Sequence, residues 1–430
     1  MRDPGAGGTT VRDARSPLAW RKLATLGVLS AIVGLNTVDR NMFGLLLPQI
    51  RKDIAIGDAA SGVLMGPAFV VVYSLASLPL ALIADRAGRR PVIALGLAAW
   101  SVVTVMTGLA GAFLHLLAAR IALGIGEASN MAPTTALIAD LYAGKRADRG
   151  RVLAMAVFAA GGPAAILLWY PVIGAVTAAH GWRAAFPMMG TVGFLFVALL
   201  LVVVREPRTV PGDHARDQRS LRHAAAVLAR PGFGWLALAG ALFSIDYSAM
   251  VAWLPSYLAG VRGLAPAQAA GVLGLYKGGF ACIATLVAGA LVAVLLRFDR
   301  RWLAWAPALA CAAMGPAQLL LLFAPQPALW HLGLGLETVL LSATTPCTFA
   351  LLAALIPDAL RSTGSAIYLL VFNLVGQSAG PLLVGLIAGH GEPLARALLV
   401  APTAAALAAA IFVVVGRGMN RSAANGSIAA

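Results

Sequence analysis

Seven ionisable residues lie within long apolar stretches of the sequence, where charged side chains are unusual. They are Asp39, Arg40, Arg120, Glu127, Asp246, Lys277 and Glu337. A charge near the centre of a bilayer costs roughly 3 kcal/mol on insertion scales, so such residues usually face a cavity or pair with each other. They also mark the paths of protons, ions and substrates, which makes these seven residues the first candidates for function.

The acid–base combinations in the first half of the chain have the chemistry of a proton-coupled anion site. Asp39 directly precedes Arg40, and Arg120 and Glu127 occur together in RIALGIGEAS, about 10 Å apart along nearly one face of a helix. A guanidinium group offers a planar fork that suits a carboxylate or a phosphate. Burial disfavours an ionised carboxylate and a nearby arginine favours it, so its protonation responds to movement of its neighbours.

We therefore predict proton coupling by Asp39 and Glu127, with Arg40 and Arg120 binding substrate or compensating charge. Further polar and aromatic residues of the spans are predicted to bind substrate or compensate charge: Asn36, Asn130, Asp246, Lys277, Glu337, Tyr247, Trp253, Tyr368 and Asn373. The alternative for the charged groups is a static network of salt bridges that holds helices together. Aromatic residues of membrane spans often belong to the core or to the interfacial belt instead.

The elements that must position these residues are predicted to be transmembrane helices. The chain of 430 residues is 60% hydrophobic and 11% charged, and its mean hydropathy is +0.85. Apolar runs of about 18 to 25 residues, long enough to cross a bilayer as helices, recur over the whole length. We predict an all-α polytopic membrane protein with twelve spans, near residues 22–50, 60–84, 91–111, 115–142, 150–178, 183–204, 233–260, 267–296, 302–323, 327–356, 363–389 and 394–416.

The net charge of +15 reflects membrane topology rather than nucleic-acid binding. Most of the Lys and Arg residues fall in alternate loops and at the two ends of the chain, which is the positive-inside bias. This bias predicts that both termini are cytoplasmic. The three cysteines lie in apolar runs, so neither a disulfide framework nor a metal centre is indicated, and we expect no cofactor.

One long hydrophilic segment divides the chain into two sets of six spans, as a parallel duplication would. The predicted organisation is a cytoplasmic tail (1–21), a helical bundle (22–204), a cytoplasmic linker (205–232), a second bundle (233–416) and a cytoplasmic tail (417–430). A weak internal repeat agrees with this division. Asp39 precedes Pro48 by the same interval at which Asp246 precedes Pro255, and both pairs lie in the first span of their half.

The loop after the second span reads ALIADRAGRR and resembles the signature loop of the major facilitator superfamily, with Ala81 in place of the first glycine. The resemblance implies two six-helix halves related by pseudo-two-fold symmetry, with spans one, four, seven and ten lining a central cavity. We predict a cytoplasmic gate in which carboxylates accept hydrogen bonds and arginines hold helix ends together, formed by Asp85, Arg86, Gly88, Arg89, Arg90, Asp140 and Arg149. The alternative is a simple positive-inside anchor.

Residues 35–207 resemble the Spinster family in particular. The matching stretches are TVDRNMFGLLLPQIRKDIAIGDAASG, RIALGIGEASNMAPTTALIADLY and VVREP. Spinster-like proteins transport amphiphilic phosphate lipids such as lysophospholipids and sphingosine phosphate, and the bacterial members couple conformational change to protons. The family's acid–arginine pair corresponds to Asp39 and Arg40, and its arginine and glutamate to Arg120 and Glu127. The chain departs from the family at Thr37, where a tyrosine is usual.

The resemblance implies a monomeric, proton-driven carrier in a bacterial inner membrane that moves an anionic lipid by alternating access. The anion:cation symporters, which carry sugar acids and similar organic anions, share the Asp-Arg and Gly-Glu-Ala patterns and are the nearest alternative. A receptor or scaffold without transport activity is a remote one, because the sequence contains no sizeable soluble domain. An enzyme is not indicated, since no nucleophile–base set, metal cluster or phosphate loop is present.

Overall fold

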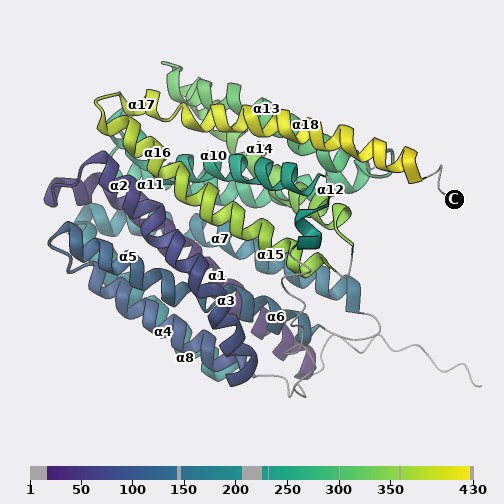
Figure 1. Ribbon diagram of the computed structural model, residues 1–430. Helices are drawn as coiled ribbons and strands as arrows, with labels where there is room; N and C mark the ends of the chain where they lie inside the picture. Colours follow the sequence, from purple (N-terminus) through teal and green to yellow (C-terminus); the bar gives the residue numbers. More distant parts are fainter. Residues whose placement is uncertain are drawn as a thin grey trace, which may run out of the picture.

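The computed structural model describes residues 17–142, 147–205, 225–230, 232–299, 301–357 and 360–426, and these contain helices but no strands (Figure 1). The first half comprises α1 (Pro17–Asp53), α2 (Asp58–Met65), α3 (Pro67–Ala87), α4 (Arg89–Thr107), α5 (Phe113–Ala128), α6 (Met131–Leu141), α7 (Ala147–His180) and α8 (Trp182–Val203). The second half comprises α10 (Phe233–Gly260), α11 (Pro266–Leu273), the π-helix η2 (Gly274–Phe280), α12 (Ala281–Leu295), α13 (Trp302–Phe323), α14 (Pro327–Leu355), α15 (Arg361–Val371), the π-helix η4 (Phe372–Gln377), α16 (Ser378–Gly389), α17 (Leu394–Ala397) and α18 (Val400–Gly426).

Ten helices of the described chain are long and apolar enough to cross a membrane. The other two predicted spans are broken into shorter pieces. The span predicted at 115–142 is interrupted by a turn at Ser129 and Asn130, between α5 and α6. The span predicted at 267–296 consists of α11, η2 and α12, and its π-helical middle carries Lys277. Such π-helical insertions are frequent at functional sites.

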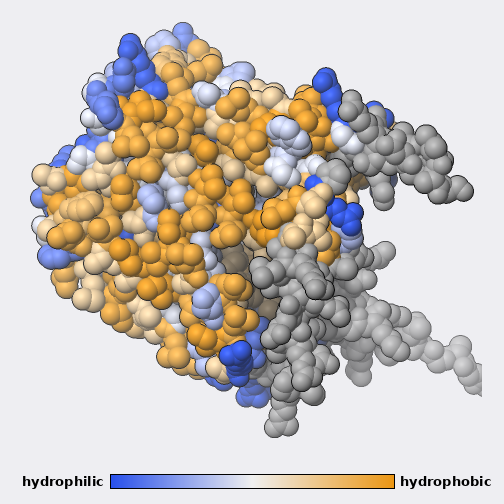
Figure 2. Space-filling model, viewed as in Figure 1, coloured by the Kyte–Doolittle hydropathy of each residue, from blue (hydrophilic) through white to orange (hydrophobic). Residues whose placement is uncertain are grey.

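The outer surface of the helix bundle is apolar between two polar ends. Figure 2 shows hydrophobic residues over most of the visible face, with hydrophilic residues gathered toward the ends of the helices. Leu75, Leu95 and Val202 are examples of large apolar side chains that remain 65%, 71% and 77% exposed. Exposed apolar surface of this extent is stable against lipid but not in water. The chain is a multi-pass membrane protein.

The two halves pack tightly against each other at the end of the molecule that carries α2, α11 and α16 (Figure 1). The backbones approach so closely there that a Cβ atom on Gly62 would lie 2.6 Å from the carbonyl oxygen of Pro381. Likewise, a Cβ on Gly44 would lie 2.9 Å from Ala252 O. At the opposite end, where α1 begins and α18 ends, α6 and α15 pack chiefly within their own halves. The structure is therefore closed at the end opposite to the first residue of α1 and the last residue of α18.

Candidate functional site

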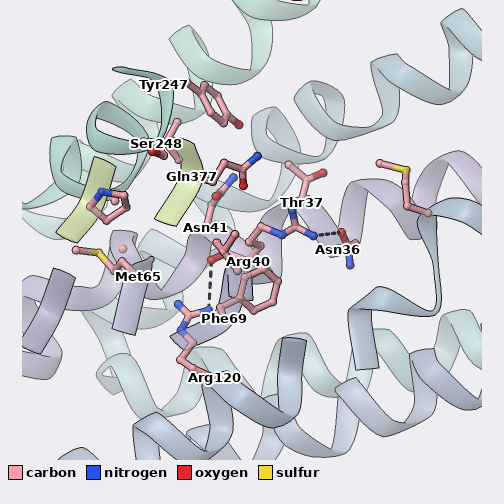
Figure 3. Close-up of a pocket in the computed structure, with 16 residues that line it drawn as sticks. Asn36, Thr37, Arg40, Asn41, Met65, Phe69, Arg120, Tyr247, Ser248 and Gln377 are labelled. Atoms are coloured by element: carbon pink, nitrogen blue, oxygen red, sulfur yellow. Dashed lines mark hydrogen bonds between the residues drawn. The ribbon is translucent and has the colours of Figure 1, made fainter. Parts of the chain in front are cut away.

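A central cavity of about 150 Å³ lies between the two halves, above the closed end. It is lined by α1, the end of α2, α3, α5 and the start of α6 on one side and by α10, η4 and α16 on the other (Figure 3). Its polar lining consists of Asn36, Thr37, Arg40, Asn41, Arg120, Tyr247, Ser248 and Gln377. Its apolar lining includes Met65, Phe69, Val70, Met131, Val251 and Ala252. A concave site with a few polar groups on an apolar wall is typical of small-molecule binding.

Arg40 is held at the cavity wall by a carboxylate from another helix. Its Nε and Nη2 atoms donate to Glu127 Oε2 at 3.2 and 3.1 Å, and Nη2 lies 3.5 Å from Asn36 Oδ1. The guanidinium group also stacks over the rings of Phe69 and Tyr73, at 4.8 and 4.6 Å from their centroids. The Arg40 side chain keeps 26% exposure, whereas Glu127 is fully buried behind it. Arg40 can therefore meet a ligand while Glu127 balances its charge.

Asp39 lies on the other side of α1 and does not line the central cavity. Its Oδ2 atom accepts a hydrogen bond of 2.6 Å from Thr104 Oγ1 on α4. Asp39 and Thr104 line a second cavity of about 10 Å³, together with Arg120 and Phe43. That volume is about the space one water molecule needs. Although Asp39 and Arg40 are neighbours in sequence, they are not an ion pair, because successive side chains of a helix point about 100° apart.

Arg120 connects the two cavities, since it lines both. Its guanidinium group lies 4.2 Å from the centroid of the Phe43 ring. Its Nη1 atom lies 3.5 Å from the carbonyl oxygen of Arg40 (Figure 3). Within the described part of the chain Arg120 forms no salt bridge, and its buried Nε has no hydrogen-bond partner. Although the two residues lie along nearly one face of their span, Arg120 lines the cavities and Glu127 lines neither of them. Arg120 is therefore a buried cation whose guanidinium group has an unused hydrogen-bond donor.

Among the other predicted binding residues, Asn36 and Tyr247 line the central cavity. Trp253 is fully buried and donates a hydrogen bond of 2.9 Å to Pro381 O, so it packs the two halves together. Tyr368 is buried against aromatic rings of the second half. Asn130 accepts a hydrogen bond of 2.8 Å from Thr134, and neither it nor Asn373 lines the cavity.

The sequence reasoning missed Thr37, Asn41 and Ser248 as cavity residues. A signal for two of them was present. Asn36, Thr37, Arg40 and Asn41 form a polar stripe along α1 at helical spacing, and this stripe faces the cavity. Ser248 follows Tyr247 in α10 and carries no comparable signal, because single serines are common in membrane helices.

The charged residues of the second half form a separate cluster that lines neither of these cavities. Lys277 of η2 forms an ion pair with Glu337 of α14, and Thr338 Oγ1 lies 3.3 Å from Glu337 Oε2. Asp246 of α10 accepts a hydrogen bond of 2.5 Å from Gln318 Nε2 of α13. These residues therefore do not reach the central cavity in this conformation.

The predicted gate residues lie together at the end where α3 and α4 meet. Arg89 forms an ion pair with Asp140 at the end of α6, and its Nε lies 3.9 Å from Asp85 Oδ1. Gly88 turns the chain with a φ of 96°, a conformation that favours glycine. Arg90 donates to the carbonyl oxygen of Leu201. These contacts join helices of one half.

The other two predicted gate residues are Arg86 and Arg149. Arg86 is exposed. The side chain of Arg149 lies outside the described residues, although its backbone belongs to α7.

The fold and its central cavity between two six-span halves are those of a large transporter family. Residues 29–381 match the family model described as Major Facilitator Superfamily. The chain belongs to this superfamily. Its members are transporters, so the protein is a membrane transporter and not an enzyme. This result confirms the predicted all-α, twelve-span fold.

Curated relatives include transporters from the Spinster group, which agrees with the resemblance seen in the sequence. An MFS-type efflux pump of Mycolicibacterium smegmatis is 28% identical over 91% of both chains. Protein spinster homolog 1 of Xenopus laevis is 27% identical over 87% of this chain and 74% of its own. The sphingosine-1-phosphate transporter SPNS2 of Danio rerio is 25% identical over 85% of this chain and 76% of its own.

The chain is also similar to a sugar-acid transporter, and a solved structure shares its fold. A probable galactarate/D-glucarate transporter of Bacillus subtilis is 28% identical, over 43% of this chain and 41% of its own. Among solved structures, a bacterial homologue of the human lysosomal transporter Spinster, inward-facing and unoccupied, has a TM-score of 0.81 and 21% identity. The match covers 95% of this chain and 98% of the other. This likeness shows a shared fold.

Proposed function

We propose that this transporter is a proton-coupled carrier of an anionic amphiphile. The observation that carries the proposal is that Arg40 and Arg120 reach one cavity between the two halves, each with a buried carboxyl on its far side. An anionic headgroup would bind the two arginines, and alternating access would follow from rocking of the halves around this site. No cofactor enters the proposal, because the proton gradient supplies the energy.

The charge arrangement predicts the sign of the coupling. Glu127 occupies hydrogen-bond donors of Arg40 that an anionic substrate would also need. When an anion takes over Arg40, the buried carboxylate of Glu127 loses its partner, and a proton then neutralises it. Proton binding and anion binding therefore favour each other, and this coupling is reciprocal. The proposal is accordingly a proton–anion symporter at this site.

Asp39 provides a second proton position that senses the substrate indirectly. It interacts electrostatically with Arg120 across the small second cavity and does not touch the central one. A substrate that draws the guanidinium group of Arg120 toward the central cavity weakens the stabilisation of an ionised Asp39. Arg120 would thus carry the coupling between substrate and Asp39.

Two substrate classes remain candidates, and each is favoured by an observation. A lipid-like anion is favoured by the apolar wall of Met65, Phe69 and Val251, and by the relatives named for Spinster and for sphingosine-1-phosphate. A small organic anion such as a sugar acid is favoured by the amides and hydroxyls on α1, and by the galactarate/D-glucarate relative. Thr37 lies in this polar stripe, where the Spinster pattern has a larger tyrosine.

A binding screen followed by flux measurements tests the proposal. Thermal unfolding of the purified protein is recorded with lysophospholipids, with sphingosine phosphate and with sugar acids. Any ligand that raises the melting temperature is then assayed in proteoliposomes with and without a pH gradient. We expect a lysophospholipid or sphingosine phosphate to stabilise the protein. Stabilisation by sugar acids alone would support the second class.

Neutralised variants then test the residues. We expect Glu127→Gln and Asp39→Asn to abolish gradient-driven flux while remaining folded. Glu392→Gln serves as the matched control, because Glu392 is a surface residue whose contact is with Arg396. Gradient-driven flux at the wild-type rate in Glu127→Gln would refute its role.

We also propose that the protein is a monomer in a bacterial inner membrane with cytoplasmic termini. The closed end then faces outward, and the cavity is accessible from the cytoplasm. Labelling with a membrane-impermeant maleimide tests the orientation in a cysteine-free background. Glu392→Cys, at the closed end, should react from outside intact cells, whereas Arg86→Cys should react only after the membrane is opened. The reverse pattern would contradict the orientation.

A further inference from the structure

The buried charges of the second half do not balance. Asp246 and Glu337 are both completely buried, and Lys277 is the cation in contact with this cluster. Glu337 lies on α14, which packs against both α10, the helix of Asp246, and η2, the segment of Lys277, so the three groups occupy one buried region. Two carboxylates and one ammonium group would carry a net negative charge in a medium that cannot solvate it. The cluster becomes neutral when it contains one additional proton.

The hydrogen bonds indicate which carboxyl holds that proton. Glu337 has the ammonium group of Lys277, whereas Asp246 has only the neutral amide of Gln318, whose Nε2 donates to Oδ1 at 2.5 Å. The second oxygen of Asp246, Oδ2, is buried without a partner, and so is the Oε1 atom of Gln318. A proton on Oδ2 turns an unpaired acceptor into a donor and removes an uncompensated charge.

The described residues of the neighbouring helices supply no second cation to Asp246. The other titratable group that interacts with it is the thiol of Cys311, on α13. Arg40 and Arg120 belong to the first half, where Glu127 and Asp39 are their acidic neighbours. Lys277 is therefore the only cation in the described chain that interacts with Asp246, and it is already engaged by Glu337.

We propose that Asp246 is a third proton-binding site, occupied in this conformation, and that Lys277 exchanges between Glu337 and Asp246 when the proton moves. In one state Asp246 is protonated and Lys277 pairs with Glu337. In the other, the proton has left Asp246 Oδ2 and resides on Glu337, while Lys277 pairs with the Asp246 carboxylate. The net charge of the cluster is the same in both states, so the exchange requires no uncompensated buried charge.

The position of Lys277 suits such an exchange. It lies in the π-helix η2, whose flanking segments α11 and α12 are α-helical, and π-helical insertions of this kind are frequent at functional sites. η2 packs against α7 of the first half, and a Cβ on Gly278 would clash with the backbone nitrogen of Leu167. When the two halves move relative to each other, the contact between α7 and η2, the segment that carries Lys277, must therefore change.

This inference adds a site to the proposed function, but the protonation of Asp246 does not depend on transport or on Asp39 and Glu127. Infrared difference spectroscopy of the full-length protein in liposomes tests it directly. A protonated carboxyl has a C=O stretching band that an ionised carboxylate lacks. At about pH 8, where an ordinary aspartate is ionised, we expect this band in the wild type and its loss in Asp246→Asn.

Two further variants make the result decisive. Asp58→Asn is the matched control, because Asp58 pairs with Arg51 and its removal should leave the band unchanged. Lys277→Met should add a second band of similar intensity, because Glu337 loses its cation and becomes protonated. This variant keeps the test valid if Asp246→Asn does not fold. Absence of the band in the wild type, or its survival in a folded Asp246→Asn, would overturn the proposal.

Discussion

The two halves of the transporter treat buried charge differently. In the first half two carboxyls, Asp39 and Glu127, accompany two arginines, and this cluster borders the central cavity. In the second half two carboxyls accompany one lysine, and this cluster lies away from both cavities. A balanced cluster can be fully ionised and can respond to an added anion, whereas an unbalanced one must hold a proton from the start.

The difference assigns a separate task to each half. The arginines of the first half can exchange their carboxylate partners for a substrate, because they face the cavity. The lysine of the second half can exchange only one carboxyl for another. We therefore expect substitution of the arginines in the first half to change substrate binding and its coupling to protons, and substitutions in the cluster of the second half to leave substrate binding nearly unchanged.

The largest effect is expected from Arg40→Met. Because this substitution removes a cation from the cavity, we expect anion affinity to fall about 100-fold. Because it also leaves Glu127 buried without its partner, we expect the free energy of unfolding to fall by about 3 kcal/mol. Adding Glu127→Gln should restore most of the stability but none of the binding. Thermal unfolding and ligand titration measure the two properties separately. Wild-type affinity in Arg40→Met would contradict the assignment of the cavity.

A somewhat smaller effect is expected where the two halves meet. Gly62→Ala places a methyl group 2.6 Å from Pro381 O, so the closed end must open or shift. We expect the substitution to destabilise the state that is closed at this end by about 1–3 kcal/mol relative to the state that is open there. Cysteine accessibility at that end measures the shift. Gly57→Ala is the matched control, because it lies nearby with open space around its Cβ position, and equal effects of the two variants would contradict the account.

Thr104→Val removes the hydrogen bond to Asp39 while keeping the shape of the side chain. We expect a loss of about 1 kcal/mol in the free energy of unfolding, because the hydroxyl group stabilises the Asp39 carboxyl. Chemical denaturation measures this change. Anion affinity should stay within about threefold of the wild type, since neither residue lines the central cavity. A loss as large as that of Arg40→Met would mean that Asp39 contacts the substrate after all.

The smallest effect on binding is expected from Lys277→Met, the counterpart of Arg40→Met in the second half. Glu337 can take up a proton when its ammonium partner is removed, so the protein should fold, and anion affinity should change by less than about twofold. The same ligand titration measures this. A loss of affinity comparable to that of Arg40→Met would show that the two halves do not divide the tasks as described.

Much of the fold could be predicted from the sequence, because lipid imposes long apolar helices and the basic loops mark alternate ends. The charged residues of the cavity could also be predicted, since charges are rare in spans. The residues that they pair with could not be predicted. Asp39 and Arg40 are neighbours along the chain, yet Arg40 pairs with Glu127 of another helix and Asp39 with Thr104. Pairing depends on how helices pack, which hydropathy does not record.

The broken spans could not be predicted for a related reason. The turn at Ser129 and Asn130 and the π-helix around Lys277 leave the apolar content of their spans almost unchanged. Trp253 was predicted to bind substrate but donates its hydrogen bond to Pro381 at the contact between the halves. Aromatic residues serve packing and binding equally well, so their type alone does not distinguish the two.

Calorimetric titration in buffers of different ionisation enthalpy tests the central claim most directly, because it counts the protons taken up when an anion binds. The account predicts net proton uptake when an anion binds to the wild type and an uptake smaller by about one proton in Glu127→Gln, because anion binding at Arg40 leaves Glu127 to be neutralised. Release of protons, or binding without any uptake in the wild type, would contradict it.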